Sequence, residues 1–182
     1  MKPFQSSTLK ALALLFIFAL LDMPAMAQEN PTLSDAEVAH VAVVANQIDI
    51  DQAKLAKERT KNKDVLQFAE TMVNDHEAVI RQASDLVQRL GVTPQENAVS
   101  KQLLGDAEKT AAMLRTKSGK AFDKAYVDNE VAYHEAVISA VEKLLIPETE
   151  NAELKTLLQN VLPALEAHLE HARMLQKQIS AK

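Results

Sequence analysis

Residues 64–91 decide the fold class of this chain: DVLQFAETMVNDHEAVIRQASDLVQRLG. Apolar side chains recur in this stretch every three or four residues, as they do on one face of an α-helix, and the run stops at Gly91, a residue type that commonly ends helices. Similar runs over residues 34–61, 120–146 and 149–179 predict three more long helices. The stretch from 64 to 90 is then the second of four.

Capping residues and prolines predict where these helices begin and end. Ser34 and Glu37 have the spacing of a capping box at the start of the first helix. Thr93-Pro94-Gln95-Glu96 predicts the start of a shorter helix that reaches about Lys117, and Pro147 is expected to end the third long helix. Pro163 lies within the last long helix, where its missing N–H predicts a kink.

The composition agrees with an all-α fold, because the chain has only 3 glycines, no cysteine and few aromatic residues. The shorter segment between the second and third long helices is nearly as long as the others and can cross the full height of a bundle. We therefore expect a ferritin-like four-helix bundle with one helical crossover. The first and last helices then run one way, and the second and third run the other way.

The N-terminus resembles a secretory signal peptide. Lys2 and Lys10 precede an apolar run over residues 11–21, and Ala25-Met26-Ala27 provides small residues for cleavage. The run is too short to span a membrane. We expect a signal peptide at 1–27, a short linker at 28–33 and a single domain at 34–180. The mature chain is then exported to the periplasm without an integral membrane segment; whether it is peripheral to the outer membrane stays open.

The charge and the motifs restrict the function. A net charge of −5 with no basic run argues against binding to nucleic acid or an anionic membrane. The sequence has no glycine-rich phosphate loop, no nucleophile elbow and no cysteine nucleophile. We therefore favour a non-enzymatic helical-bundle protein acting in envelope maintenance or stress survival. An envelope protein or a small ligand as partner, and a homo-oligomer, stay open.

Three of the 5 histidines lie on the apolar faces of three different predicted helices. An imidazole in a bundle core must find partners for both ring nitrogens, so it is either a hydrogen-bonded core residue or a metal ligand. The three, with the apolar residues in helical register with them, are His76 with Met72 and Val79, His134 with Val131 and Ile138, and His168 with Leu165 and Ala172.

Three segments around these histidines resemble one family. They are Met72-Val73-Asn74-Asp75-His76, Ala125-Tyr126-Val127-Asp128-Asn129-Glu130 and Leu162-Pro163-Ala164-Leu165-Glu166-Ala167-His168-Leu169. They are similar to an uncharacterised family of exported bacterial proteins, the domain of unknown function 4142. The resemblance extends from about Leu33 to Met174 and implies a ferritin-like fold. It also implies the family's description as predicted outer-membrane proteins, although this sequence shows neither barrel strands nor a lipidation cysteine.

Counting about 1.5 Å per residue from the helix ends puts His76 and His134 within about one turn in height, with Asn46 and Asp49 at the same level. Glu130 shares a helix face with His134. His168 is expected a turn or two higher, level with Tyr126.

Two interpretations of this cluster stay open. In one, Asp49, His76, Glu130 and His134, with Asp75 or His168, bind iron, manganese, zinc or copper between the second and third long helices. In the other, which we favour from the sequence, the same groups form a hydrogen-bonded network that fixes helix register. A dinuclear iron site of the usual pattern is not supported, because the required Glu-x-x-His pair is missing on two helices.

Overall fold

The computed structural model describes residues 32–181, so the expected signal peptide at 1–27 and residues 28–31 of the linker lie outside it. Within the described range the chain is helical, without a strand, and the all-α prediction is confirmed. The elements are α1 (Asp35–Arg59), α2 (Lys63–Leu90), α3 (Ala98–Arg115), α4 (Gly119–Ala140), the π-helical turn η1 (Val141–Leu145), α5 (Ile146–Glu148) and α6 (Ala152–Ser180). No helix in this range is both long and apolar enough to cross a membrane.

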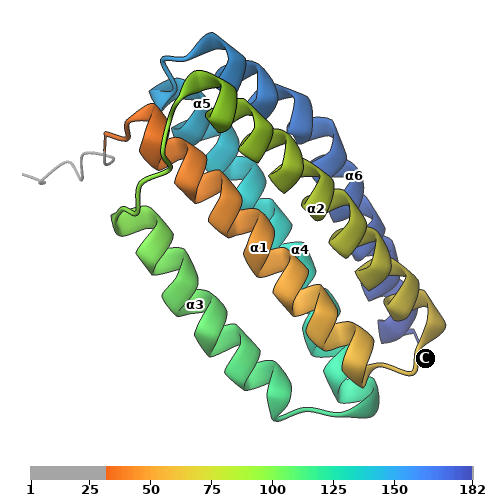
Figure 1. Ribbon diagram of the computed structural model, residues 1–182. Coiled ribbons are helices and arrows are strands. Elements are labelled where there is room, and N and C mark those ends of the chain that lie inside the picture. Colours follow the sequence, from red (N-terminus) through yellow and green to blue (C-terminus); the bar gives the residue numbers. More distant parts are fainter. Residues whose placement is uncertain (1–31, 182) are drawn as a thin grey trace, which may run out of the picture.

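The four long helices α1, α2, α4 and α6 form the bundle, and α3 lies outside it (Figure 1). α1 packs against α2, and α4 packs against α6, each pair joined at one end of the bundle. α3 runs back along the outside beside α1, so that α4 starts at the same end as α2. The predicted helical crossover is therefore confirmed, and α2 and α4 run in the same direction.

The sequence places the candidate site between the second and third long helices, but the corresponding helices α2 and α4 are not packed side by side. α2 packs against α1 and α6, and α4 packs against the same two helices, so α2 and α4 are diagonal partners across the bundle. Side chains from these two helices therefore meet at the bundle axis rather than along a shared helix interface. A site built from both of them is surrounded by all four long helices.

Local capping explains where α1 begins and where α2 ends. The Ser34 side chain accepts a hydrogen bond from the backbone N–H of Glu37, and the Glu37 carboxylate accepts one from the N–H of Ser34, which completes the predicted capping box. Gly91 follows α2 with φ of 64°, a left-handed conformation in which a side chain is unfavourable. Both predicted ends are confirmed.

Two predicted helix starts are wrong by a few residues because tertiary contacts and alternative caps replace the predicted ones. α3 starts after Asn97, which forms a capping box with Ser100, rather than at Thr93. The backbone N–H of Gln95 donates to the carbonyl of Ala36, and this contact with α1 holds the segment extended. α6 starts after Asn151, whose side chain accepts from two backbone N–H groups, three residues later than expected.

The two prolines have different consequences. The third long helix continues through η1 and α5, two residues past its expected end, and so includes Pro147. The preceding turn, η1, is π-helical, and in it the backbone N–H of Ile146 donates to the carbonyl of Val141. That wider turn accommodates a ring that would clash in a regular α-helix. Pro163 lies inside α6, which is helical on both sides of it. The kink there stays a prediction.

The core consists of two hydrophobic clusters with a polar layer between them. One cluster contains Phe68, Met72 and Leu175 near the end of the bundle where α1 meets α2. The other contains Val41 and Leu165 in the opposite half. Buried charged and polar side chains lie at mid-height between them, and they include Asp49, His76, Glu130, His134 and His168.

Two of the three glycines, Gly91 after the end of α2 and Gly105 inside α3, provide a stability test in which the two substitutions should have opposite effects. An added Cβ meets no atom within 4 Å at Gly91 or at Gly105, so only backbone conformation matters. We expect Gly91→Ala to lower the free energy of unfolding by about 1–2 kcal/mol, because the residue is left-handed. Gly105→Ala, inside α3, should raise it by about 0.5–1 kcal/mol. Urea unfolding measures both, and equal effects would contradict the conformational argument.

Candidate metal centre

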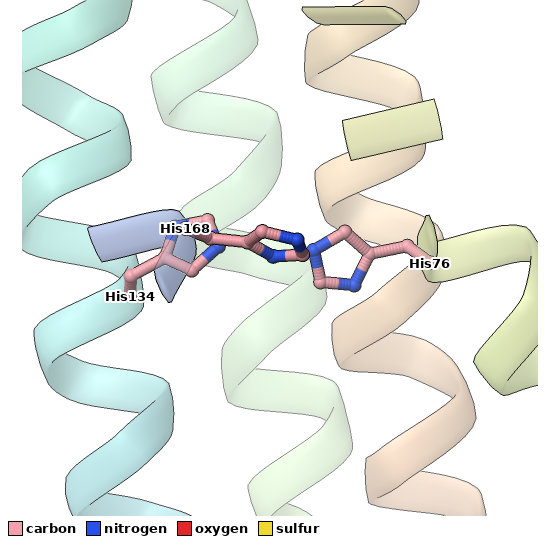
Figure 2. Close-up of side chains that lie close together, drawn as sticks. All are labelled: His76, His134 and His168. Atoms are coloured by element: carbon pink, nitrogen blue, oxygen red, sulfur yellow. The ribbon is translucent and has the colours of Figure 1, made fainter. Parts of the chain in front are cut away.

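The three predicted histidines meet at the axis of the bundle. Figure 2 shows His76 from α2, His134 from α4 and His168 from α6 with their rings turned toward one another. The ring centroids are 5.8 Å apart for His76 and His134, 5.3 Å for His76 and His168, and 5.6 Å for His134 and His168. The three imidazoles therefore form a nearly equilateral triangle.

Each imidazole uses one ring nitrogen to bind an oxygen at the edge of the cluster. All three partner atoms are carbonyl or carboxylate oxygens, so the ring nitrogen must carry the proton and donate. The bonds are His76 Nδ1 to Asn46 Oδ1 at 2.7 Å, His134 Nδ1 to the backbone oxygen of Glu130 at 3.0 Å, and His168 Nε2 to Asp75 Oδ2 at 2.9 Å. In a neutral ring this hydrogen bond leaves the lone pair on the other nitrogen.

The remaining ring nitrogens are buried without partners. Within residues 32–181, His76 Nε2, His134 Nε2 and His168 Nδ1 have no hydrogen-bond partner. One ring nitrogen from each histidine lies within 4.8 Å of one from each of the other two. Two such nitrogens on neutral rings cannot satisfy each other, since each offers a lone pair and neither offers a proton. A cation at the centre would satisfy all three.

Asp49 adds a carboxylate to this triangle. Its side chain is 0% exposed, and its Oδ2 lies 3.4 Å from His76 Nε2 and 3.6 Å from His134 Nε2. Neither carboxylate oxygen has a hydrogen-bond partner in the described part of the chain. Two ligand atoms at about 2.0–2.1 Å from one tetrahedral ion are about 3.3–3.4 Å apart, so these separations fit the edges of a coordination polyhedron.

Glu130 lies beside the triangle rather than in it. Its carboxylate is buried, one oxygen lies 3.6 Å from His134 Nδ1, and the Tyr126 hydroxyl interacts with the carboxylate. Asp49, Glu130 and His134 also form a group whose ligand atoms lie within 4.8 Å of one another. Glu130 can therefore bind an ion displaced toward α4, or support His134 from behind.

Burial favours the neutral form of His76 and His134. Burial, followed by the charges of His168 and His134, lowers the pKa of His76 to about 3. Burial also lowers the pKa of His134 to about 4. It raises the pKa of Asp49 to about 7, and that of Glu130 well above its ordinary value with help from the charge of Asp49. Without a cation the cluster therefore disfavours charge on every one of these four groups.

The height of His168 is the one placement in which the sequence argument was wrong. It was expected a turn or two above His76 and His134, but its ring lies in contact distance of both. α6 begins at Ala152 rather than near Thr149, and three residues correspond to about 4.5 Å, or nearly one turn. The corrected start accounts for much of the error.

Other residues considered in the sequence lie away from this centre. The spacing of His168 and His171 is one at which two histidines can share a metal ion, but His171 packs edge-on against Phe68, with ring centroids 5.1 Å apart. Met72 belongs to a hydrophobic cluster, and Met174 is 54% exposed. Asp75 is half-exposed and holds His168 in place. The role of Asn46 as partner of His76 was missed, although its level had been identified.

These features define the class of protein: an all-α bundle with a crossover helix and a buried cluster of histidines and carboxylates at its axis. The chain matches the domain of unknown function family DUF4142 over residues 21–175, and it belongs to that family. No curated protein matches it.

A solved structure with a similar fold is described as CopM in the Cu(II)-bound form. The similarity has a TM-score of 0.61 and covers 81% of this chain and 99% of that chain, with 14% sequence identity. At this identity the similarity supports the helical-bundle fold.

Proposed function

We propose that this protein binds one divalent transition-metal ion at the bundle axis through His76, His134, His168 and Asp49. The proposal rests on three imidazoles that offer ligand atoms within 4.8 Å of one another, each with one buried nitrogen that has no partner among residues 32–181, beside the buried Asp49 carboxylate. Each donor comes from a different long helix, so an ion there links all four.

The alternative of a purely structural hydrogen-bonded network fits these contacts less well. A buried polar group without a partner costs about 1–3 kcal/mol, and such a network is stabilising only when its members satisfy each other. Here the outer nitrogens are satisfied and the inner ones are not. Hydrogen bonds that orient the far side of a ligating imidazole are the usual surroundings of protein-bound metals.

The donor set favours copper(II) or zinc(II) among the four metals considered. Three imidazoles and one carboxylate are borderline ligands, which suit these ions better than the oxygen-rich surroundings that manganese prefers. Copper(II) is bound most tightly of the divalent series by a given site. The copper(II)-bound form of the structurally similar CopM supports the same choice.

We infer that the site binds and retains a metal ion rather than catalysing a reaction. Three imidazoles and the Asp49 carboxylate would supply four protein donors, enough to fill a tetrahedral shell, whereas a catalytic zinc site keeps a position open for water or substrate. The expected export of the chain would place this ion-binding bundle in the periplasm. The bound ion would neutralise the buried Asp49 and supply a partner to the three imidazoles.

Metal analysis and thermal melting test the proposal. Protein purified from a periplasmic fraction should contain about one ion per chain, or take up one equivalent of copper(II) or zinc(II). At a metal concentration about 100 times the Kd, the melting temperature should rise by about 5–10 °C over chelator-treated protein. The absence of stoichiometric uptake, together with an unchanged melting temperature, would eliminate metal binding.

A further inference from the structure

A large cavity lies in the half of the bundle next to the histidine cluster. Its volume is about 680 Å³, within the range of small-molecule binding sites and several times that of a cavity left by one missing core side chain. The four long helices and one face of α3 line it. His76 and His168 form part of the wall, while Asp49 and His134 lie outside it.

Most of the wall is aliphatic. Several apolar side chains that face the cavity are only partly buried, among them Val79, Val137 and Val161. Side chains on the inner faces of a bundle normally pack to the density of an organic crystal and leave few voids larger than a water molecule. Val137 and Val161 pack on one side against the hydrophobic cluster that contains Val41 and Leu165, and the rest of each side chain stays exposed to the cavity. An apolar molecule in the cavity would cover that exposed part.

The cavity is elongated and polar at one end. Asn46, Gln52 and Asn129 line it at the level of the histidines. Leu154 lines it 14 residues before His168 on α6, which corresponds to about 21 Å along the helix. A ligand that fills this space is therefore long, with one hydrogen-bonding end beside the amides and an apolar remainder.

α3 provides a loosely packed cover. Only Ser100 and Leu114, near its two ends, are buried, whereas its middle presents Leu103, Ala107 and Thr110 to the cavity. Figure 1 shows α3 set apart from the bundle, alongside α1. A helix with few buried contacts can move away at little cost, so this side gives a ligand its way in.

The charge of the wall selects a neutral ligand. The lining residues, all within the described part of the chain, include Asp75 and Asp106 but no lysine or arginine. A carboxylate or phosphate would enter without a counter-ion and against two acidic side chains.

We propose that this cavity binds a neutral single-chain amphiphile of the long-chain alcohol class, with its hydroxyl at the histidine level and its alkyl chain toward Leu154. This inference goes beyond metal binding and does not depend on it, because the amides and the aliphatic wall are present whether or not the imidazoles hold an ion.

A displacement assay tests this binding site. Chelator-treated protein is titrated with the neutral apolar fluorophore N-phenyl-1-naphthylamine, which is then displaced with 1-hexadecanol or with hexadecanoate. We expect saturable one-site binding, and displacement by the alcohol at a concentration at least about tenfold lower than by the anion. Equal or stronger displacement by hexadecanoate would overturn the neutral head group. No saturable fluorophore binding, with or without copper(II), would overturn the site.

Variants locate the fluorophore. Val161→Phe, about 10 Å along α6 from His168, and Ala107→Trp on α3 place aromatic rings in the cavity and should each weaken binding at least about tenfold. Ala112→Trp, on a part of α3 that does not line the cavity, should change it less than about twofold.

Circular dichroism checks the fold of each variant, and copper(II) uptake by Val161→Phe should be unchanged. Fluorophore binding that survives both substitutions in folded protein would contradict the proposal. Wild-type protein that takes up no metal would instead count only against the metal centre. Failure of the metal proposal and failure of the cavity proposal are therefore distinguishable.

Discussion

Asp49→Asn is expected to stabilise the metal-free protein by about 1–3 kcal/mol near pH 8 while it lowers metal affinity. The ionised carboxylate is fully buried, has no hydrogen-bond donor among the described residues and faces two lone pairs on His76 and His134. An amide at this position can donate to one of those nitrogens and carries no charge. A substitution that improves folding and weakens binding indicates that the wild-type side chain is retained for the ligand.

The pH dependence of this difference has a defined sign. Burial raises the pKa of Asp49 from 3.8 to about 7 in the folded protein, so between these values the folded state binds the proton more tightly than the unfolded chain. The stability that wild type derives from this group is therefore present at low pH and is lost as pH rises toward 7. The advantage of Asp49→Asn should be small near pH 4, grow up to about pH 7 and stay constant above it.

Urea unfolding of both chelator-treated proteins from pH 4 to 8 measures this difference. Contributions from the histidines largely cancel when the two proteins are compared at each pH. Asp51→Asn is the matched control, because Asp51 lies on the same helix with an exposed side chain. A wild-type protein more stable than Asp49→Asn at pH 8 would show that Asp49 belongs to a satisfied network instead.

His134→Ala should reduce copper(II) or zinc(II) affinity by at least about 100-fold, the upper end of what is lost when only a supporting partner of a ligand is removed. The same substitution should abolish the rise in melting temperature on metal addition. The reason is geometric: His134 lies near both His76 and His168, and its Nε2 also approaches Asp49. Calorimetric titration and melting curves with metal provide the two measurements.

The other histidines supply the comparison. His171→Ala removes an imidazole from the same helix as His168, but one that packs against Phe68 outside the cluster, and it should leave metal affinity unchanged. Asn46→Ala removes the partner that orients His76 and should cost about 10–100-fold. A ranking in which His171→Ala and His134→Ala lose equal affinity would mean that the ion binds elsewhere.

Much of the fold could be predicted from local signals. The capping box at Ser34 and the glycine at position 91 act within one turn, and both are found as expected. The start of α3 could not be predicted in this way, because a backbone bond from Gln95 to α1 overrides the capping signal at Thr93. Such a contact joins residues 59 positions apart in the chain, and no local pattern contains it.

The candidate site was predictable in part for a similar reason. Helical periodicity placed His76 and His134 on inward faces, and counting the rise per residue brought them to one level. Because every residue adds a fixed rise along a helix, an error in the start of a helix shifts the expected height of its residues, and this misplaced His168 by about a turn. Side-chain rotamers on several helices determine which oxygens accept hydrogen bonds from the ring nitrogens at the edge of the cluster. Helical periodicity does not determine rotamers.

The polar layer at mid-height has a consequence for cooperative unfolding. It divides the apolar core into two separate clusters, which share the four long helices. Without an ion, each half can open as a separate unit, and amide hydrogen exchange would report two protection levels. An ion bound to side chains of all four helices would keep the two halves from opening separately, so that the backbone amides of the whole bundle would share one protection level.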